Sequence, residues 1–189
     1  MKRIGILGDI GSGKTYVAKC FGFPVFNADL EVAKIYNNNK NIFRKLKKEF
    51  PLHFDSFPIK KKEVINVILS NKGNLKKIIR IVHREVRKKM NDFLKKNKNK
   101  KIVVLDIPLL LENKINKKKD ILIFVESNKL EILKRLKKRK NFNKKILNNF
   151  KKIQLSLDSK KKKSHYIIKN NFKRNSVKTT VKKIINNLI

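Results

Sequence analysis

Residues 4–15, Ile-Gly-Ile-Leu-Gly-Asp-Ile-Gly-Ser-Gly-Lys-Thr, decide the fold of this chain. The stretch is a short apolar segment that runs into Gly-x-x-x-x-Gly-Lys-Thr, the spacing of the phosphate-binding P-loop. Glycines let the backbone turn tightly and aim its N–H groups at phosphate oxygens, and a helix that begins near Ser12 directs its positive end at the same anion. The pattern therefore predicts a strand, a phosphate-binding loop and a helix in a protein that binds a nucleoside triphosphate.

Each residue type in this loop has a predicted task. Lys14 is long enough to reach the β- and γ-phosphates, and the Thr15 hydroxyl is a suitable ligand for Mg²⁺. The residues that we expect to bind ATP here are Gly8, Gly11, Ser12, Gly13, Lys14, Thr15 and Tyr16. The alternative is a glycine-rich turn that matches by chance. It is disfavoured because a strand-like segment precedes the pattern and the start of an amphipathic helix follows it.

Length and composition indicate a single domain over residues 1–189. Hydrophobic residues make up 40% of the chain, which is enough for a core of this size. No apolar run approaches the length of a membrane span, and the apolar segment at the start leaves no room for a signal peptide. The single cysteine, Cys20, cannot form an internal disulfide, and the scattered histidines predict no zinc site. We expect a cytoplasmic protein without a membrane partner.

The charge is extreme, with 51 lysines and arginines against 14 aspartates and glutamates and a formal net charge of +37. Such an excess can indicate a nucleic-acid partner. Here it is spread over the whole chain, and aromatic residues rarely interrupt the basic runs. It also accompanies abundant Asn, Ile and Phe, residues whose codons are rich in A and T. We therefore interpret it as solvated lysine-rich helix faces, with no specific nucleic-acid partner.

Apolar segments recur along the chain in an alternating α/β pattern. The predicted strands span residues 4–7, 24–29, 102–105, 121–125 and 166–168. The predicted helices span residues 14–21, 30–90 with breaks at Pro51 and Pro58, 130–139, 144–157 and 177–188. This order predicts a three-layer fold of the P-loop nucleotide-kinase type, a parallel sheet flanked by helices. A helical insertion at 30–95 could hold a phosphoryl acceptor, and the basic stretch 135–160 is a candidate lid.

Further motifs accompany the P-loop along nearly the whole chain. They are Asn27-Ala28-Asp29, His83-Arg84, Asp106-Ile107-Pro108-Leu109-Leu110-Leu111-Glu112, the pair Arg135 and Arg139 with the later Gln154 and Lys160, and Ile168-Lys169-Asn170. With them the chain resembles the dephospho-coenzyme A (dephospho-CoA) kinase family, for which the strand motif 106–112 is the most specific match. Four positions depart from the family pattern: Asp9 and Phe172 replace glycines, Asn27 replaces an aspartate and Arg84 replaces a proline.

The resemblance implies a phosphotransferase with an alcohol acceptor. Its reaction is transfer of the γ-phosphoryl group of ATP to the ribose 3′-hydroxyl of dephospho-CoA, the last step of CoA synthesis. Catalysis is then positioning and charge neutralisation, in which Lys14 and Arg135 are the implied catalytic cations. Mg²⁺ is the implied cofactor, held directly by Thr15 and through water by Asp106. The ATP-binding positions that the resemblance adds are Arg139 and Asn170.

Two arginines and one carboxylate gain their roles from this resemblance. Arg135 and Arg139, four residues apart on one predicted helix face, can reach the transferring oxygens when a lid closes. Asp29, expected at the carboxyl end of the second strand, is the candidate that orients the acceptor hydroxyl and takes its proton. Asn27 cannot accept a proton at neutral pH. The alternative role of Asp29 is a helix N-cap.

The acceptor pocket is also implied by the resemblance. Its positions are Asp29, His83, Pro108, Leu109, Leu110 and Glu112. Plainer explanations exist for each motif: a proline stops a strand, the leucines could be core, Glu112 could form a structural ion pair, and His83 could be an ordinary surface or core histidine.

Three functions stay open from the residues. The first is a dephospho-CoA kinase, with ATP and dephospho-CoA as partners. The second is another P-loop kinase that acts on a nucleoside monophosphate or a small metabolite, and the third is a nucleic-acid-linked P-loop ATPase. The motif 106–112 favours the first, and we expect a monomer.

Overall fold

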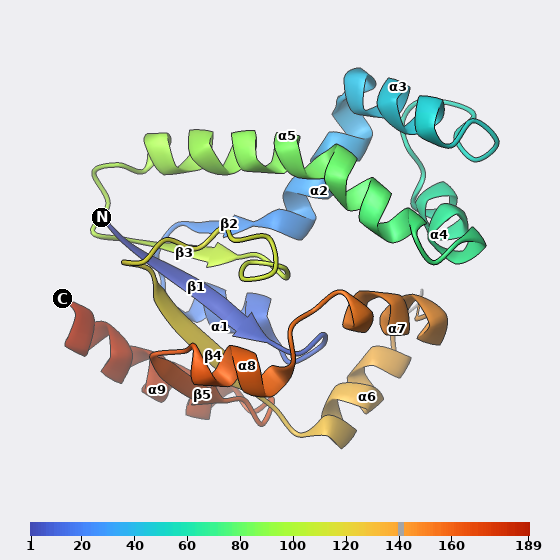
Figure 1. Cartoon of the computed structure of the whole chain (residues 1–189). Coiled ribbons are helices and arrows are strands. Elements are labelled where there is room, and N and C mark those ends of the chain that lie inside the picture. Colours follow the sequence, from blue (N-terminus) through green and yellow to red (C-terminus); the bar gives the residue numbers. More distant parts are fainter. Residues whose placement is uncertain (140–141) are drawn as a thin grey trace. The chain divides into compact units, whose positions relative to one another are not determined.

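The computed structural model describes residues 1–139 and 142–189 (Figure 1). Its strands are β1 (Lys2–Gly8), β2 (Val25–Asn27), β3 (Ile102–Asp106), β4 (Ile121–Glu126) and β5 (Tyr166–Lys169). Its helices are α1 (Lys14–Cys20), α2 (Ala28–Asn38), α3 (Lys40–Glu49), α4 (Lys61–Ser70), α5 (Asn74–Lys96), α6 (Lys129–Lys137), α7 (Lys144–Lys152), α8 (Leu157–Lys162) and α9 (Arg174–Leu188). Each predicted strand is present. Positions 140 and 141 of the candidate lid lie outside the described residues.

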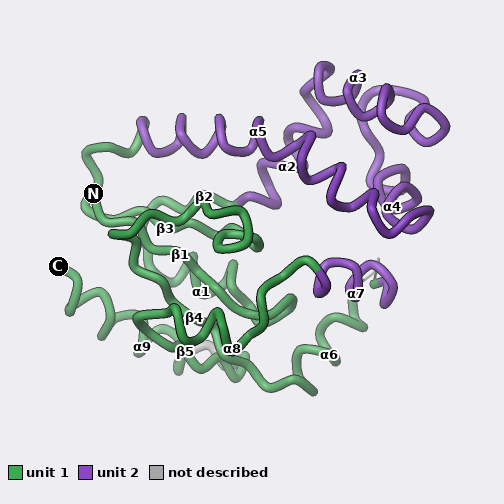
Figure 2. The backbone as a smooth tube through the Cα atoms, viewed as in Figure 1, with its two compact units in different colours: residues 1–27, 96–142, 153–189 green, residues 28–95, 143–152 purple. Residues whose placement is uncertain are grey.

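The described residues divide into two compact units (Figure 2). The first comprises Met1–Asn27, Lys96–Phe142 and Ile153–Ile189 and contains the sheet. The second comprises Ala28–Lys95 and Asn143–Lys152, and its described elements are helices. The insertion expected at 30–95 belongs to the second unit, and the candidate lid at 135–160 is divided between the two.

The first unit is built on a parallel sheet with strand order β2-β3-β1-β4-β5. β1 lies at the centre, and the strand is buried on both faces, as parallel sheets require. On one face, alternate strand residues form the core together with α1 and α9. That core includes Ile4, Ile6, Val17, Val104, Ile123, Val125, Ile168, Val177 and Val181. Figure 1 shows α8 on the opposite side of the sheet from α1, so helices flank the sheet as predicted.

The segment that follows β3 covers the other face of β1. Leu110 is fully buried there. A Cβ on Gly5 would come within 2.5 Å of Leu110 Cδ2 and 3.0 Å of Leu122 Cδ2. The glycine therefore allows the 106–112 motif to pack directly onto the central strand.

The second unit is held together by amphipathic helices. α5 is the longest, and it buries one face through residues spaced three or four positions apart. Those residues are Leu75, Ile78, Val82, Val86 and Met90. Asn39 directly precedes α3, and its Oδ1 accepts from Ile42 N–H over 3.0 Å and caps the helix. Among the described helices, none is long and apolar enough to cross a membrane.

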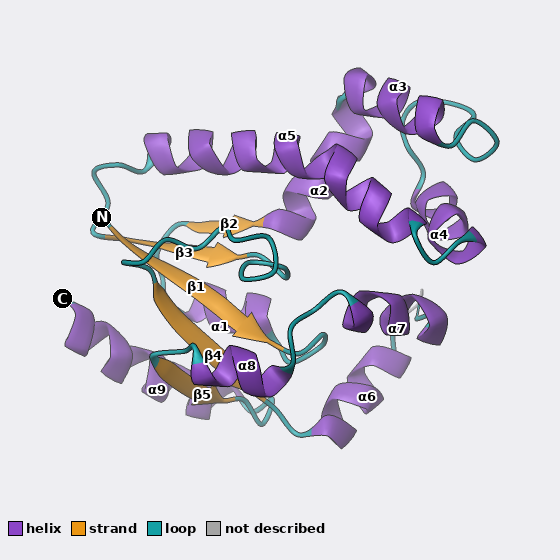
Figure 3. Ribbon diagram, in the orientation of Figure 1, coloured by secondary structure: helices purple, strands orange, loops and turns teal. Residues whose placement is uncertain are grey.

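Several predicted boundaries were wrong, and two of them concern the second strand and the candidate lid. β2 ends at Asn27 and α2 begins at Ala28 without an intervening loop (Figure 3), so Asp29 lies in the first turn of α2 rather than at the end of a strand. A carboxylate in a first helical turn is stabilised by the helix dipole, which favours the early helix start. The single helix predicted at 144–157 is two helices, because Ser156 Oγ accepts from Ser159 N–H and starts α8 anew.

Candidate active site

The P-loop turns through glycines with positive φ angles, which are 144° at Gly8, 87° at Gly11 and 89° at Gly13. L side chains rarely adopt these angles, so the backbone itself requires the glycine pattern of the sequence. Ser12 N–H donates to Asp9 O over 3.2 Å and closes the turn. Gly13, in the left-handed region, directly precedes α1. The loop thus has the tight turn that the motif predicts.

The same glycines allow the loop to pack against the ends of the strands. A Cβ on Gly8 would come within 2.7 Å of Val125 O, at the end of β4. A Cβ on Gly13 would come within 2.4 Å of Asn170 Nδ2, just after β5. Backbone and a buried amide cannot move aside easily, so both contacts exclude any larger residue.

Two side chains donate hydrogen bonds to the same carbonyl oxygen of the P-loop and hold the loop in place. Ser12 O accepts from Asn170 Nδ2 over 2.9 Å and from Ser127 Oγ over 3.0 Å. Asn170 is only 2% exposed, and its Oδ1 accepts from Phe172 N–H over 2.9 Å. The structure therefore gives Asn170 a role in holding the P-loop, and a contact with ATP stays a prediction. Ser127 also holds the loop, and the sequence analysis missed it. A serine after a strand is common, and no motif around residue 127 indicates this contact.

The ammonium group of Lys14 lies against the loop. Its Nζ donates to Asp9 O over 2.7 Å and to Gly8 O over 3.3 Å. These carbonyls hold the positive charge within the turn whose N–H groups are suited to phosphate oxygens. Tyr16, which the sequence placed in the ATP-binding set, is partly buried against the hydrophobic core, and its contact with ATP stays a prediction.

A polar cluster next to the loop brings together the ends of β2 and β3 and the first turn of α1. Asp106, 3% exposed at the end of β3, accepts at its Oδ2 from Thr15 Oγ1 and from Asn27 Nδ2, each over 2.6 Å. Asn27 and Asp106 are register partners on adjacent parallel strands. The resemblance assigned both Thr15 and Asp106 to Mg²⁺, and the direct contact between them is a finding of the structure. The contact of Asn27 could have been found only from the register.

This cluster suits Mg²⁺ better than a transition metal. A hydroxyl and a carboxylate are hard oxygen ligands, and Mg²⁺ keeps several waters and phosphate oxygens rather than a complete protein shell. Among the described residues, no group of three or more His, Cys, Asp or Glu could hold a metal ion on its own. Thr15 and Asp106, already in contact through 2.6 Å, therefore fit the ion that the sequence implied.

The two predicted lid arginines are not on one helix face. Arg135 lies in α6, but α6 ends at Lys137, and Arg139 follows the helix with its N–H donating to Leu136 O. Both side chains are exposed. The guanidinium carbon of Arg135 lies 4.4 Å from the ring centroid of Phe172. Because α6 ends before Arg139, the two arginines do not share a helix face, contrary to the prediction. Arg135 contacts the aromatic ring of Phe172.

The motif 106–112 mixes packing residues with a buried ion pair. Leu110 is core, as described above, whereas Pro108 and Leu109 are partly exposed. Glu112 Oε1 lies 2.9 Å from Lys160 Nζ, and the two side chains are 9% and 2% exposed. The same oxygen accepts from Leu155 N–H over 2.9 Å. Glu112 therefore ties the end of the motif to the segment before α8.

The partners of this ion pair show how a charge is tolerated in the interior. Lys160 Nζ also donates to Gln154 Oε1 over 2.8 Å, so the buried ammonium has a carboxylate and an amide oxygen as partners. Glu112 Oε2 is buried and has no hydrogen-bond partner within the part of the chain that the structure describes. Glu112 thus forms the structural ion pair that was the alternative explanation for it. A hydrogen bond from an acceptor molecule to Glu112 Oε2 stays a prediction.

The second unit contains His83 and a polar cavity. Burial, followed by the neighbouring Arg87 charge, lowers the pKa of His83 below its usual range. Its Nε2 is buried and lacks a hydrogen-bond partner among the described residues. His83 is therefore neutral at physiological pH, and binding of the acceptor by it stays a prediction.

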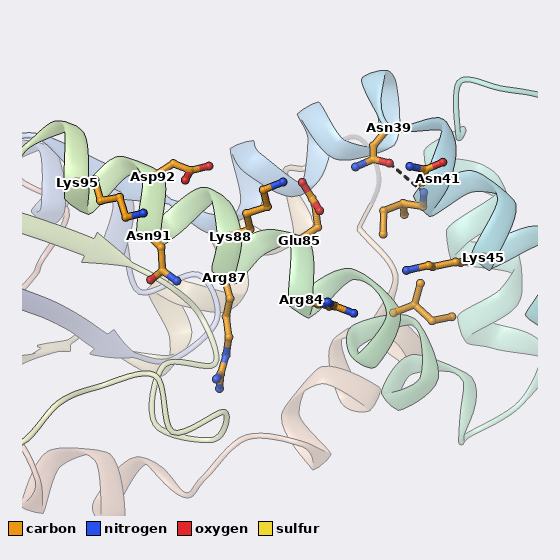
Figure 4. A pocket seen from close by; sticks show the side chains of 12 residues that line it. Asn39, Asn41, Lys45, Arg84, Glu85, Arg87, Lys88, Asn91, Asp92 and Lys95 are labelled. Carbon is orange, nitrogen blue, oxygen red and sulfur yellow. Dashed lines mark hydrogen bonds between the residues drawn. The ribbon is translucent and has the colours of Figure 1, made fainter.

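The cavity, of about 720 Å³, lies between α5 and the start of α3 (Figure 4). Cationic side chains dominate its lining over two carboxylates. The cations are Lys45, Arg84, Arg87, Lys88 and Lys95, and the carboxylates are Glu85 and Asp92. Arg84, where the family pattern has a proline, is among these cations. The cavity is chemically suited to an anionic ligand.

Comparison with known proteins identifies relatives of the whole chain. A family model described as dephospho-CoA kinase matches residues 2–176. The dephospho-CoA kinase of Wolbachia pipientis wMel is 34% identical over 190 aligned positions, which cover 98% of this chain and 97% of the relative. That of Bartonella henselae is 30% identical over 173 positions, with 89% and 88% covered.

Solved structures agree on the fold. TT1252 from Thermus thermophilus has a TM-score of 0.79 at 25% identity and covers 100% of this chain and 98% of its own. A dephospho-CoA kinase from Campylobacter jejuni has a TM-score of 0.66 at 22% identity, with 99% and 97% covered. A shikimate kinase from Bacteroides thetaiotaomicron has a TM-score of 0.52 at 13% identity, with 99% and 98% covered. These likenesses confirm the predicted P-loop kinase fold.

The buried ion pair yields a prediction about stability. Lys160→Met leaves the Glu112 carboxylate buried without its cation, which should lower the free energy of unfolding by about 3–5 kcal/mol. The double variant Lys160→Met/Glu112→Leu should recover most of that loss, because neither charge is then buried. Urea unfolding followed by circular dichroism measures both values. A loss below about 1 kcal/mol in Lys160→Met would contradict the buried, paired geometry.

His83 yields a prediction about pH. Because its folded-state pKa lies below the ordinary value of about 6.5, the unfolded chain takes up this proton at a higher pH than the folded chain does. The His83 contribution to the free energy of unfolding should therefore decrease as the pH falls below about 6.5, and His83→Gln should remove that part of the slope. Urea unfolding between pH 7.5 and 5, with an NMR titration of the imidazole, tests this. A His83 titration at or above pH 6.5 would refute it.

Proposed function

This chain belongs to the dephospho-CoA kinase family, and we propose that its P-loop site transfers the γ-phosphoryl group of ATP to the ribose 3′-hydroxyl of dephospho-CoA. The product is CoA, so the reaction is the final step of CoA synthesis. The observation that supports this site best is the contact between Thr15 and Asp106 beside the glycine turn that holds Lys14. It joins a phosphate-binding loop and an oxygen ligand set at the carboxyl ends of parallel strands, where open α/β sheets bind their ligands.

Charge neutralisation is the main contribution of the first unit. The N–H groups of the P-loop and Lys14 Nζ meet the β- and γ-phosphates, and Lys14 exchanges its carbonyl contacts for phosphate oxygens when ATP binds. Arg135 and Arg139, both exposed, are the cations available to the migrating phosphoryl group. When bound, Mg²⁺ neutralises charge on the β- and γ-phosphates. Thr15 and Asp106 are the residues that would hold it.

Deprotonation of the acceptor is assigned to Asp29. The 3′-hydroxyl oxygen attacks the γ-phosphorus, the bond from phosphorus to the ADP oxygen breaks, and the hydroxyl proton passes to the Asp29 carboxylate. Asp29 is exposed in the first turn of α2, so its carboxylate is accessible to a substrate. Asn27 has a different task, because its amide donates to Asp106.

The acceptor is assigned to the helical second unit. Dephospho-CoA carries a diphosphate, and the cavity between α5 and α3 is lined mainly by cations. His83, Pro108, Leu109 and Glu112 stay candidates for further acceptor contacts, and Leu110 contributes by packing the motif onto Gly5. A monomeric state, a cytoplasmic location and the lack of a specific nucleic-acid partner also stay predictions.

One assay separates this function from its alternatives. ATP turnover is measured with dephospho-CoA, AMP, CMP, shikimate and single-stranded DNA at physiological ionic strength. We expect rapid turnover with dephospho-CoA alone. Faster turnover with a nucleoside monophosphate or shikimate would favour another small-molecule kinase, and DNA-stimulated hydrolysis would favour a nucleic-acid-linked ATPase.

Lys14→Ala should abolish most phosphoryl transfer while the fold survives. Loss of a fixed donor at developing charge reduces kcat by about 10²–10³-fold in comparable sites. Lys19→Ala, an exposed lysine in the last turn of the same helix, is the matched control and should keep wild-type turnover. Steady-state kinetics with dephospho-CoA and thermal unfolding are measured for both variants. Near wild-type kcat in a folded Lys14→Ala enzyme would refute the assigned role.

Asp29→Asn should reduce kcat by about 10²-fold or more, with ATP affinity nearly unchanged, because the amide cannot take the proton. Glu31→Gln is the matched control, since Glu31 also lies in the first turn of α2. A carboxylate that only interacts with the helix dipole would change stability by about 0.3–1 kcal/mol and leave kcat intact. If both variants turned over dephospho-CoA equally well, Asp29 would be a helix-terminal charge rather than a base.

A further inference from the structure

Phe172 has a backbone conformation that normally requires glycine. Its φ is +62°, in the left-handed region, where a residue with a Cβ is disfavoured. Its N–H donates to Asn170 Oδ1 over 2.9 Å, and Asn170 in turn holds Ser12 O of the P-loop. The turn after β5 is therefore part of the P-loop support, and this chain places an aromatic side chain at its most constrained position.

The ring of Phe172 lies between the P-loop and α6. Its Cε1 is 3.6 Å from the place where a Cβ on Gly13 would lie, which is ordinary van der Waals distance. On the ring, the guanidinium carbon of Arg135 is 4.4 Å from the centroid. The distance is that of a cation–π contact. A single side chain thus connects the residue before α1 with the arginine of α6.

The electrostatic surroundings of Arg135 explain why an aromatic partner is useful. Lysines at 134, 137 and 138 repel its guanidinium, and the α6 carboxylate Glu131 is paired with Lys134 over 3.2 Å. Among the described residues, no carboxylate forms an ion pair with Arg135. A carboxylate would also compete with phosphate for the guanidinium, whereas an aromatic face attracts the cation and leaves its N–H donors unoccupied.

We propose that Phe172 is a positioning residue that holds the guanidinium of Arg135 beside the P-loop, ready to meet the phosphates of ATP. The inference rests on the proposed role of Arg135 in phosphoryl transfer. The contact reduces the range of positions that a long, exposed side chain explores among like charges, so less ordering is required when ATP binds. An exposed contact of this kind corresponds to a factor of about two to five.

The contact itself is tested without turnover. The proton on Arg135 Nε should show an upfield ring-current shift in the NMR spectrum of the ATP-free enzyme. Phe172→Leu keeps a side chain with the same backbone restriction but removes the ring, so the shift should disappear, while Phe172→Tyr should retain it. An Arg135 Nε proton shift that is the same in wild type and Phe172→Leu would overturn the proposal, whatever Arg135 does in catalysis.

The functional consequence is tested by a double-mutant cycle. Phe172→Leu and Phe172→Gly should each lower kcat/KM for ATP by about two- to five-fold, and Phe172→Tyr should be close to wild type. The glycine variant relaxes the backbone, so equal losses in the leucine and glycine variants assign the effect to the ring. Normal activity in Phe172→Gly together with a loss in Phe172→Leu would overturn the proposal in favour of backbone strain.

The second arm of the cycle uses Arg135→Ala, which should itself lose about 10²-fold in kcat. In that background Phe172→Leu should have no further effect, because the ring has nothing to position. An undiminished effect would overturn the proposal. Lys129→Ala, an exposed cation at the start of α6, is the control and should leave the Phe172→Leu effect intact. Full activity of Arg135→Ala would refute the role of Arg135 in phosphoryl transfer, on which this inference rests, while the Nε proton shift reports separately on the contact.

Discussion

The hydrogen bonds that Ser12 O accepts from Asn170 and Ser127 attach the P-loop to the ends of β4 and β5, and the remaining site depends on this attachment. It is possible because Gly13 leaves room for the Asn170 amide. With the loop fixed, Lys14 begins α1 at a defined place and its ammonium reaches the loop carbonyls. A phosphate-binding loop must keep its N–H groups in one arrangement before the ligand arrives, and the strand ends supply that order.

The charge of the chain creates a second constraint. With a formal net charge of +37, cations are abundant and carboxylates scarce, yet the interior admits a cation only with a partner. Arg3 pairs with Asp120 over 2.9 Å, and Lys160 pairs with Glu112 over 2.9 Å. Both pairs lie in the first unit and join segments distant in sequence. Two of the few carboxylates thus pair with the buried cations, while the other lysines, chiefly exposed, remain hydrated.

Two departures from the family pattern have structural counterparts at the site. The family pattern has an aspartate at position 27, whereas here Asn27 donates an amide proton to Asp106. Asp106 is therefore the carboxylate of this pair, and its negative charge lies next to Thr15. Phe172 accepts a left-handed φ of +62° that a glycine would adopt without strain. The ring it introduces contacts Arg135. The two departures therefore change which side chains surround the phosphate site.

Local patterns in the sequence determined the strands, the P-loop and its glycines, because apolar β-branched runs and positive φ angles are properties of neighbouring residues. The tertiary structure decided the contact of Asn27 with Asp106, since it depends on the register of β2 and β3. It also decided that Lys160, one of 51 basic residues, is the lysine buried against Glu112. The observed helix boundaries differ from the predicted ones, so that Asp29 lies in α2 and Arg139 lies beyond the end of α6. These features arise from packing between distant segments, where the identity of a residue does not reveal which partner the fold brings to it.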